Sequence, residues 1–368
     1  MNEFIKHLDD LEDPRQAAKV TYPLVNIIFI AICAIFHSAT TWEDINIFAN
    51  CKRDWLNKYI NLSSGIPSSD TFRRLFCLLD PNQIGELTRE IISKFLNKNI
   101  EDHLCFDGKA VRGNKSPAKG IKPIQIVSAW SESQGLSLAE VTVDKKSNEI
   151  TAIPMLIDLL DIKGSTISID AMGTQKDIAE KIRQEDGHYV LALKGNQGKF
   201  HEGVKSYMLE EGTALSNLIL DGIDDSHGRS VRRRYFATEV PKSLVSNGFK
   251  DLKTLIATET ISQRGAGSPV TAEWRYYITD HDRNNEKLAE YIRGHWGVEN
   301  KLHWILDVHL NDDHDKKLDR NAADNFSRIK RLLLNLVRKN DADSKLSVGR
   351  KLKKMLWDEN YFTKIITG

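Results

Sequence analysis

The sequence has 368 residues, which is long enough for two domains, or for one large domain with an insertion, around a sizeable core. Its 40% hydrophobic and 28% charged residues fit a soluble globular enzyme. The net charge of +1 gives no sign of a nucleic-acid partner, so any such sign must come from how the charges are distributed.

The most apolar segment, 23–36, has about 14 residues, fewer than the roughly 20 that cross a bilayer as a helix. It predicts a buried helix and no membrane partner. The first residues, MNEFIKHLDDLEDPRQ, lack a basic flank, an apolar run and a small-residue cleavage site, so we expect no secretory signal and a cytoplasmic protein. The cysteines are far apart, with no CxxC pair, which predicts buried thiols rather than a zinc ribbon or disulfides. They are Cys33, Cys51, Cys77 and Cys105.

Residues 1–98 are predicted to form an all-helical N-terminal domain, because apolar residues recur at helical spacing and prolines lie where helices should begin or end. The stretch IPSSDTFRRLFCLLD predicts a helix capped by Ser68 or Ser69. Together with TWEDINIFANCKRDWL it could form a helix-turn-helix that binds DNA, although any two helices joined by a turn give the same pattern.

From residue 99 to about 340 the pattern predicts an α/β domain. Three strands are followed by alternating helix and strand, which indicates a mixed sheet. The expected order is strands 103–107, 123–130 and 136–143, helix 150–160, strand 165–170, helix 174–184 and strand 188–194.

Residues 200–280 differ from what precedes them, and strand-like runs at 231–240, 252–259 and 272–279 predict a β-rich insertion. Residues 284–312 then have helical character, and 324–339 form another helix. We expect 341–368 to form a basic helical tail.

Basic residues gather in two places. Between Lys316 and Lys354 there are thirteen Lys or Arg residues and four Asp residues, a net charge of +9. A shorter run has Arg229 and then three consecutive arginines, 232–234. Either run could follow a DNA backbone, or could be an ordinary solvated surface.

Two predicted strands end in an aspartate that is followed directly by a small residue: Asp107 with Gly108, and Asp170 with Ala171. A carboxylate at the end of an apolar strand projects into the crevice where open α/β sheets bind ligands. Two such acids repel each other unless a positive group lies between them. Hard divalent cations bind carboxylates, phosphate oxygens and water, so the pair suits phosphoryl chemistry.

A third acid is expected on the helix in YIRGHWGVENKLHWILDVHLNDD. Helical spacing places His295 four residues before Glu299 and His303 four residues after it, on one face. Trp296 and Asp307 lie on the same side. An ordinary polar helix edge is the simpler alternative.

The segments LEDPRQAAKVTYPL, GIPSSDTFRRLF, FDGKAVRG, ISIDAMGTQ, YVLALKGNQ and HWGVENKLHWILDV occur in this order. They resemble the H-repeat-associated (Rhs-linked) transposases of bacterial insertion sequences, a DDE family, and the resemblance extends to about residue 340. It implies a ribonuclease-H-like catalytic core with the β-rich insertion before the glutamate helix. It also implies that the catalytic and metal-binding acids are Asp107, Asp170 and Glu299.

One departure from the family pattern concerns the residues around Glu299. Related transposases often carry Tyr-x2-Arg-x3-Glu-x6-Lys, whereas this chain has Ile292, His295 and Leu306 at those places. Tyr291 and Arg293 are nearby but out of register. The DNA contacts of that signature are therefore not assigned to them.

The resemblance implies an in-line displacement at a DNA phosphodiester with two Mg²⁺ or Mn²⁺ ions as cofactors. The expected partners are the ends of the mobile element and target DNA, and the chain should be a homo-oligomer on DNA, associated with the nucleoid when bound. The candidate DNA contacts are basic or amide side chains near the acids or in the tail. They are Arg112, Lys194, Asn196, Gln197, Arg293, His295, Arg350, Lys351, Lys353 and Lys354.

Two alternatives stay open at this point. A zinc hydrolase could use His295, Glu299 and His303, but it would leave Asp107 and Asp170 without a role. A transposase-derived DNA-binding protein could keep the acids and no longer cut DNA.

Overall fold

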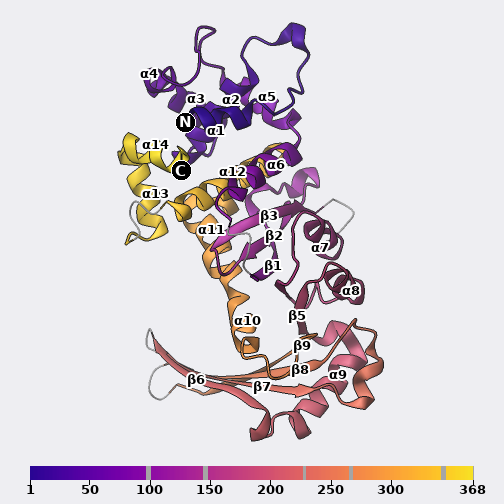
Figure 1. The fold of residues 1–368 in the computed structure, drawn as a ribbon. Helices are drawn as coiled ribbons and strands as arrows, with labels where there is room; N and C mark the ends of the chain where they lie inside the picture. The colour runs from indigo at the N-terminus through magenta and orange to yellow at the C-terminus, as the bar shows by residue number, and fades with distance from the viewer. Residues whose placement is uncertain (97–100, 144–147, 227–228, 265–267, 341–344, 368) are drawn as a thin grey trace.

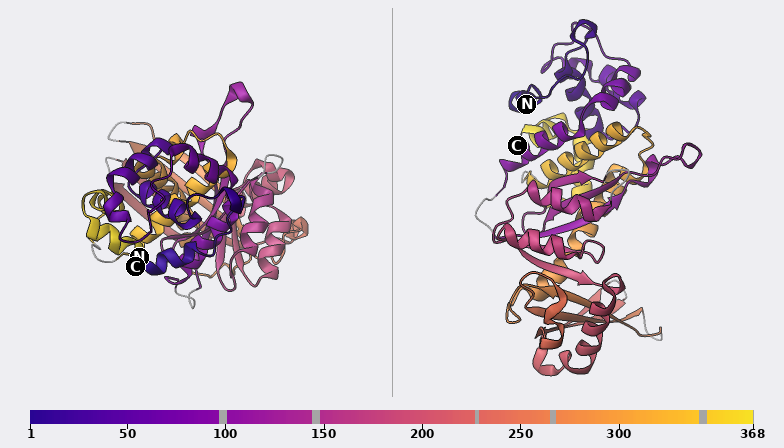
Figure 2. Two further views of the ribbon diagram at one scale, coloured as in Figure 1. Left: turned by 90° about the horizontal axis from the view of Figure 1, so that it is seen from above. Right: turned by 90° about the vertical axis from the view of Figure 1, so that its right-hand side faces the viewer.

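The computed structural model describes residues 1–96, 101–143, 148–226, 229–264, 268–340 and 345–367. The molecule is elongated, with a helical layer at one end, a mixed sheet in the middle and a β-rich part at the other end (Figure 1). Both chain termini lie at the helical end, as Figure 1 and the right-hand view of Figure 2 show.

The helical end is built from both ends of the sequence. Helix α2 (Leu24–Phe36) is its centre, and the segment Ile27–Phe36 is buried throughout, as its apolar sequence predicts. Helix α12 (Arg320–Lys339) packs across α2, α5 and α6, and α13 and α14 pack against α12. The other bounds are α1 Asn2–Leu8, α3 Trp42–Cys51, α4 Arg53–Leu56, α5 Ser69–Leu78, α6 Pro81–Ser93, α13 Val348–Trp357 and α14 Glu359–Thr367.

Two helix starts show how the sequence sets these boundaries. Ser68 is the N-cap of α5, and its side chain accepts a hydrogen bond from the Thr71 backbone N–H, so the first of the two predicted caps is the one used. Asp319 caps α12 in the same way through the Ala322 N–H. The helix therefore begins at Arg320, four residues before the predicted start.

The central sheet has the strand order β3-β2-β1-β4-β5, continued by β9-β8-β7-β6. Strand β1 pairs antiparallel with β2 and parallel with β4, and β4 pairs parallel with β5. This arrangement confirms the expected ribonuclease-H-like mixed α/β core. The bounds are β1 His103–Ala110, β2 Gln125–Ser131, β3 Leu136–Thr142, β4 Thr166–Ile169 and β5 His188–Leu193.

The two faces of the central sheet are covered by different helices. Leu104 and Phe106 of β1 share an apolar core with α7 (Glu149–Asp158) and α8 (Lys176–Gln184). Cys105 points the other way and joins the core of the helical end. Successive side chains of a strand point to opposite faces of the sheet, so these contacts bury β1 on both faces.

The insertion is an extension of the same sheet. It begins with α9 (Gly198–Tyr207) and a π-helical turn, Met208–Gly212, so the first part of the predicted β-rich segment is helical. Strand β9 then pairs with β5 and so joins the insertion to the central sheet, with Thr279 opposite Val190. Strand β6, which was not predicted, is largely exposed, including Ile219, Leu220 and Ile223. The bounds are β6 Leu218–Ser226, β7 Arg229–Glu239, β8 Thr254–Arg264 and β9 Thr271–Thr279.

Three helical pieces connect the insertion to α12. They are α10 (Leu288–Gly294), a π-helical turn (Val298–His303) and α11 (Trp304–Leu310). Within the described segments, no helix is both long enough and apolar enough to cross a membrane.

The prediction for the thiols is right in part. All four cysteines are free; Cys33 and Cys105 are buried and Cys77 is partly buried, but Cys51 is exposed. Cys51 is the last residue of α3, of which only Ile45 and Ala49 are buried, so its position on the helix overrides its apolar character.

Candidate active site

Asp107 and Asp170 lie side by side because their strands are parallel neighbours in register. Phe106 pairs with Ile169, and each aspartate is the next residue in its chain. Asp107 does not end its strand, contrary to the prediction. Strand β1 continues to Ala110 because β2 still pairs with it there, whereas β4 stops at Ile169.

The turn after β4 holds Asp170 through its own backbone. Its Oδ1 accepts hydrogen bonds from the N–H groups of Met172 at 3.0 Å and Gly173 at 3.2 Å. A Cβ on Gly173 would lie 2.4 Å from Ile169, so only glycine fits this turn. The carboxylate is thus fixed by a tight turn against the sheet.

Glu299 lies in the π-helical turn Val298–His303 and lines a cavity together with Asp107 and Asp170. This cavity, of about 600 Å³, is lined by Asp107, Asp170, His295 and Glu299, with Trp296 on its wall. Single π-helical turns are frequent at functional sites because they change the direction of the side chains that follow. The structure thus brings together the three acids that the sequence pointed to.

The two histidines that flank Glu299 have separate partners. His295 Nδ1 lies 2.9 Å from Ser168 Oγ, and His303 Nδ1 lies 3.4 Å from Asp107 Oδ2. Each imidazole is therefore engaged through a nitrogen with a different strand.

A fourth carboxylate, missed in the sequence, belongs to Glu149. It is the first residue of α7, and its Oε1 is so close to Gly108 that a Cβ there would lie 2.2 Å from it. Burial and then the nearby Asp170 and Asp107 raise the pKa of Glu149 to about 7. The signal in the sequence was a glutamate at the start of the helix that follows three strands, but only the sheet order places that helix beside β1.

Repulsion among these acids also affects Glu299. Its pKa is raised by burial and by the charge of Asp107, with His303 and Arg275 acting in the opposite direction. Carboxylates that raise each other's pKa lose that repulsion when a cation binds between them. The electrostatics of the cavity therefore favour a positively charged ligand.

The oxygen-rich set of side chains fits a hard divalent cation. In the described part of the chain, no three His, Cys, Asp or Glu side chains are grouped closely enough to hold a metal ion by themselves. Mg²⁺ is usually bound by one or two carboxylates together with phosphate oxygens and water. Asp107, Asp170 and Glu299 line one cavity with carboxylates of this kind, and Glu149 lies near the two aspartates.

The loop after β5 lies beside the Asp170 turn, as predicted. Lys194 is exposed on the rim of the cavity. Asn196 Nδ2 donates to the Ala171 carbonyl at 2.6 Å, and Gln197 Nε2 donates to the Thr174 carbonyl at 2.6 Å. These two amide nitrogens therefore hold the turn, and of the three residues Lys194 is the one that carries a charge.

A second cavity, of about 270 Å³, lies between α10 and the insertion sheet. Arg293 lines it together with Arg233, Arg275 and Trp296, and the Arg275 guanidinium lies 4.9 Å from the Trp296 ring centre. Of the short basic run, Arg232 pairs with Asp221 and Arg234 with Glu259. Arg233 is the member that faces this second cavity.

Part of the basic segment near the C-terminus is buried rather than exposed. Several of its cations are buried and paired with acids, because α12 packs between the sheet and the helical end. Lys351 is also buried, and its Nζ donates to the Asn340 carbonyl at 2.6 Å. Lys351 is therefore unavailable to DNA in this fold. The other buried cations are Lys317, Arg328, Lys330 and Arg331.

Three candidates in α13 keep some exposure. Arg350 and Lys353 are exposed, whereas Lys354 is half-buried, with its Nζ 4.5 Å from the Tyr361 ring centre. They lie at the helical end, near both termini (Figure 1).

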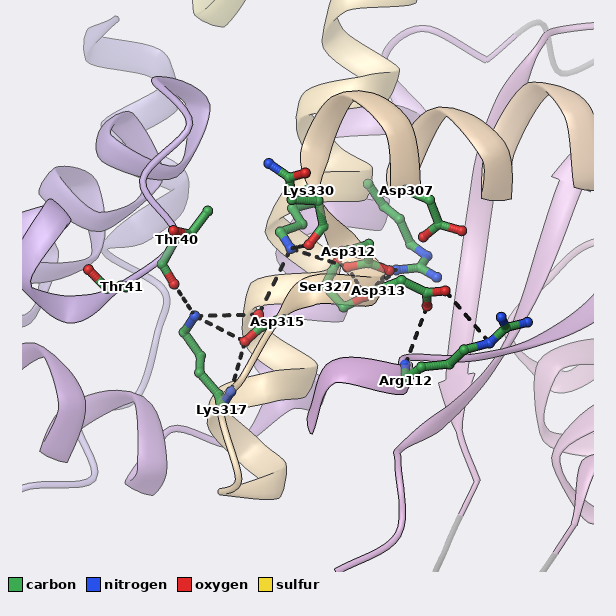
Figure 3. Close-up of polar contacts among 12 residues, drawn as sticks. Thr40, Thr41, Arg112, Asp307, Asp312, Asp313, Asp315, Lys317, Ser327 and Lys330 are labelled. Carbon is green, nitrogen blue, oxygen red and sulfur yellow. Dashed lines mark hydrogen bonds and ion pairs between the residues drawn. The ribbon is translucent and has the colours of Figure 1, made fainter. Parts of the chain in front are cut away.

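An ion network around the buried Lys109 connects β1 to α11. Lys109, two residues after Asp107, is 7% exposed, and its Nζ lies 2.5 Å from Asp307 Oδ1 and 2.8 Å from Asp313 Oδ1. Asp307 is on α11, directly after the π-helical turn. Arg112 is exposed, and its Nε lies 3.7 Å from Asp313 (Figure 3).

The network continues into the helical end. Lys330 of α12 lies 3.4 Å from Asp312, which is fully buried, and 3.9 Å from Asp315. Lys317 pairs with Asp315 and donates to the Thr40 carbonyl at 2.8 Å, as Figure 3 shows. A chain of contacts thus runs from β1 to the loop before α3.

Comparison with known proteins gives matches over most of the chain. The family model described as "Transposase DDE domain" matches residues 98–336, and "DDE_Tnp_1-associated" matches residues 5–91. "H repeat-associated putative transposase YhhI" of Escherichia coli (strain K12) is 36% identical, and the match covers 100% of this chain and 98% of the relative.

Two further matches are a shorter relative and a solved structure. "Inactive transposase YbfQ" of Escherichia coli (strain K12) is 36% identical over 75 residues, which is 20% of this chain and 89% of that protein. A solved structure of piggyBac transposase in a synaptic complex with hairpin DNA is 12% identical, with a TM-score of 0.48, and covers 99% of this chain and 79% of that chain.

Proposed function

The chain belongs to the Transposase DDE domain family, and from this premise we propose that it cuts DNA at the ends of a mobile element and joins them to target DNA. The proposed catalytic and metal-binding residues are Asp107, Asp170 and Glu299. The proposed partner is DNA, on which the chain acts as a homo-oligomer.

The observation that carries the proposal is the in-register parallel pairing of β1 with β4. It puts Asp107 beside Asp170, and Glu299 lines the same cavity from a different part of the chain. Carboxylates that repel one another are kept together where they serve to bind cations.

The protein's own residues position the DNA and the reacting groups. Asp107, Asp170 and Glu299 would hold two Mg²⁺ or Mn²⁺ ions, which, when bound, lower the pKa of an attacking water or 3′-hydroxyl and stabilise the leaving oxygen. Lys194 on the rim offers a positive charge to the DNA backbone. Gly173 and the amides of Asn196 and Gln197 fix the turn that carries Asp170.

The test is a cleavage assay with the full chain and DNA that flanks its own gene, in Mg²⁺ or Mn²⁺. Asp107→Asn keeps the shape of the side chain and removes the charge, so it should abolish cleavage and leave DNA binding nearly intact. Asp161→Asn is the matched control, because Asp161 is exposed in a turn after α7. Equal loss of binding and cutting in Asp107→Asn would contradict a catalytic role and indicate a role in folding.

A second candidate is a DNA-binding protein that no longer cuts. One relative is named an inactive transposase, which supports a binding protein that does not cut. The match to that relative covers 20% of this chain. Sequence-selective binding without cleavage in either metal would support this candidate and refute the first.

A further inference from the structure

The π-helical turn that carries Glu299 is held from the side opposite the cavity. Gly297 and Lys301 come two residues before and two residues after Glu299. Two residues cover about half a helical turn, so both positions lie on the side of the helix opposite Glu299. Because Glu299 lines the cavity, contacts at Gly297 and Lys301 reach the turn from behind.

Glu132, in the turn directly after β2, makes two of these contacts. Its Oε2 accepts a hydrogen bond from the Trp130 indole N–H at 2.9 Å, and its Oε1 forms an ion pair with the Lys301 ammonium group. A Cβ on Gly297 would overlap with Oε2, so a glycine is what lets the carboxylate approach the turn this closely. The Glu132 side chain is 22% exposed. Its carboxylate is thus fixed between the end of β2 and the π-helical turn.

Arg338 of α12 holds the same turn through its backbone. Its guanidinium lies 4.7 Å from the Trp130 ring centre, and it donates to the Gly135 carbonyl at 3.3 Å and to the Lys301 carbonyl. Burial lowers the pKa of Arg338 to about 10, with Glu132 acting in the opposite direction, so the guanidinium stays charged near pH 7. The side chain and the backbone of Lys301 are therefore both held.

A π-helical turn needs such support because it competes with the regular α-helix. Its hydrogen bonds run from residue i to i+5, so it contains one residue more than an α-helical turn, and it is rare. Relaxation to an α-helix would shift the two sides of the turn by one residue, which is a rotation of about 100°. Lys109 holds Asp307 on the far side of the turn, so the rotation would move Glu299 relative to the two aspartates.

We propose that Glu132 and Arg338 are positioning residues that keep the π-helical turn in place and thereby direct Glu299 toward Asp107 and Asp170. Neither side chain is among the described residues that line the cavity, so each acts through the turn. The inference rests on the proposed function for the role of Glu299, but the hold on the turn does not.

The first test measures the turn directly and needs no activity. Hydrogen exchange of the full chain is followed at the backbone amides of Val298–His303. Glu132→Gln keeps the size of the side chain and removes its charge, and Arg338→Met removes the guanidinium donors. We expect faster exchange of this segment in both variants and no change in Glu185→Gln, an exposed control at the end of α8. Protection equal to wild type in either variant would overturn the role of that residue.

The second test displaces the Glu132 carboxylate without removing its charge. In Gly297→Ala the new Cβ would push the carboxylate away, although alanine itself favours a helix. A shift of about 1 Å between catalytic groups can cost roughly 10²-fold in rate, so kcat should fall by about this factor in Gly297→Ala and in Glu132→Gln, with similar KM values for DNA. Wild-type kcat values in both variants would overturn the inference.

Combining the two substitutions tests whether they act through one contact. If they do, the kcat of the double variant should be no lower than that of the weaker single variant. A loss of roughly 10⁴-fold, the product of the single losses, would show separate effects and overturn the inference.

The dependence on Mn²⁺ distinguishes positioning from partial unfolding. A displaced Glu299 should raise the Mn²⁺ concentration that gives half of the maximal rate, whereas unfolding lowers the rate and leaves this concentration unchanged. An unchanged value in Glu132→Gln and Gly297→Ala would therefore overturn the positioning role. A wild type that cuts in neither metal refutes the proposed function, while the exchange result still decides whether Glu132 and Arg338 hold the turn.

Discussion

Removing the charge of Glu149 should stabilise the protein when no divalent cation is present. Burial, Asp170 and Asp107 raise the pKa of this carboxyl from 4.5 to about 7 in the folded chain. Between these two values the folded chain binds a proton more tightly than the unfolded chain. The stability from this proton is fully present below pH 4.5 and is lost as the pH rises through 7.

The size of the effect follows from the same two values. A rise from 4.5 to about 7 corresponds to at most about 3 kcal/mol of destabilisation at pH 8. Glu149 is partly exposed, and solvent screening reduces this to roughly 1–2 kcal/mol. Glu149→Gln removes the charge and keeps the shape, so it should raise Tm by about 1–3 °C at pH 8 and by almost nothing near pH 4.5.

Thermal unfolding at both pH values, with EDTA and then with Mg²⁺, measures this effect. The cation should raise the Tm of the wild type more at pH 8 than at the lower pH, because it neutralises the repulsion that ionisation creates. Glu180→Gln, on the exposed side of α8, is the matched control and should change little. A Glu149→Gln variant with an unchanged or lower Tm at pH 8 in EDTA would refute the reasoning.

The other predictions concern stability and DNA binding. Lys109→Met should cost about 1–3 kcal/mol in chemical denaturation, since it removes the cation that the partly buried Asp307 and Asp313 share, whereas the exposed Arg112→Met should cost under about 1 kcal/mol. Lys351→Met should lower stability without changing DNA affinity. If α13 contacts DNA, Lys353→Met should flatten the salt dependence of binding without changing stability, and an unchanged salt slope would exclude α13 from the DNA path. Ser68→Ala should lower the unfolding free energy by about 1 kcal/mol, and an unchanged value would show that the α5 cap is not needed.

The position of the two aspartates could be predicted because it depends on local patterns. Each lies at the end of an apolar run, and the order of strands and helices indicates that their strands are near each other. The strand length at Asp107 could not be predicted. It depends on β2, which extends β1 to Ala110 by pairing from the other side.

The charges of α12 show a different limit of the sequence. Counting Lys and Arg residues predicts an exposed basic surface. In the structure, however, Lys330 and Arg331 lie beside Asp312, which is about one helix length earlier in the chain. Whether a cation faces solvent or a buried acid depends on which helices pack together. Glu149 was missed for the same reason, because its neighbours Asp107 and Asp170 come from other elements.

The network around Lys109 is best understood as a constraint on geometry. Bringing so many charges out of water costs several kcal/mol for each ion, so ion pairs of this kind add little net stability. Lys109 follows Asp107 by two residues, and Asp307 follows Glu299 by eight, so their contact at 2.5 Å holds together the two elements whose acids must meet. A shift of about 1 Å between catalytic groups can cost roughly 10²-fold in rate. The same network reaches Thr40 through Lys317 and Asp315, so it also ties the loop before α3 to α12.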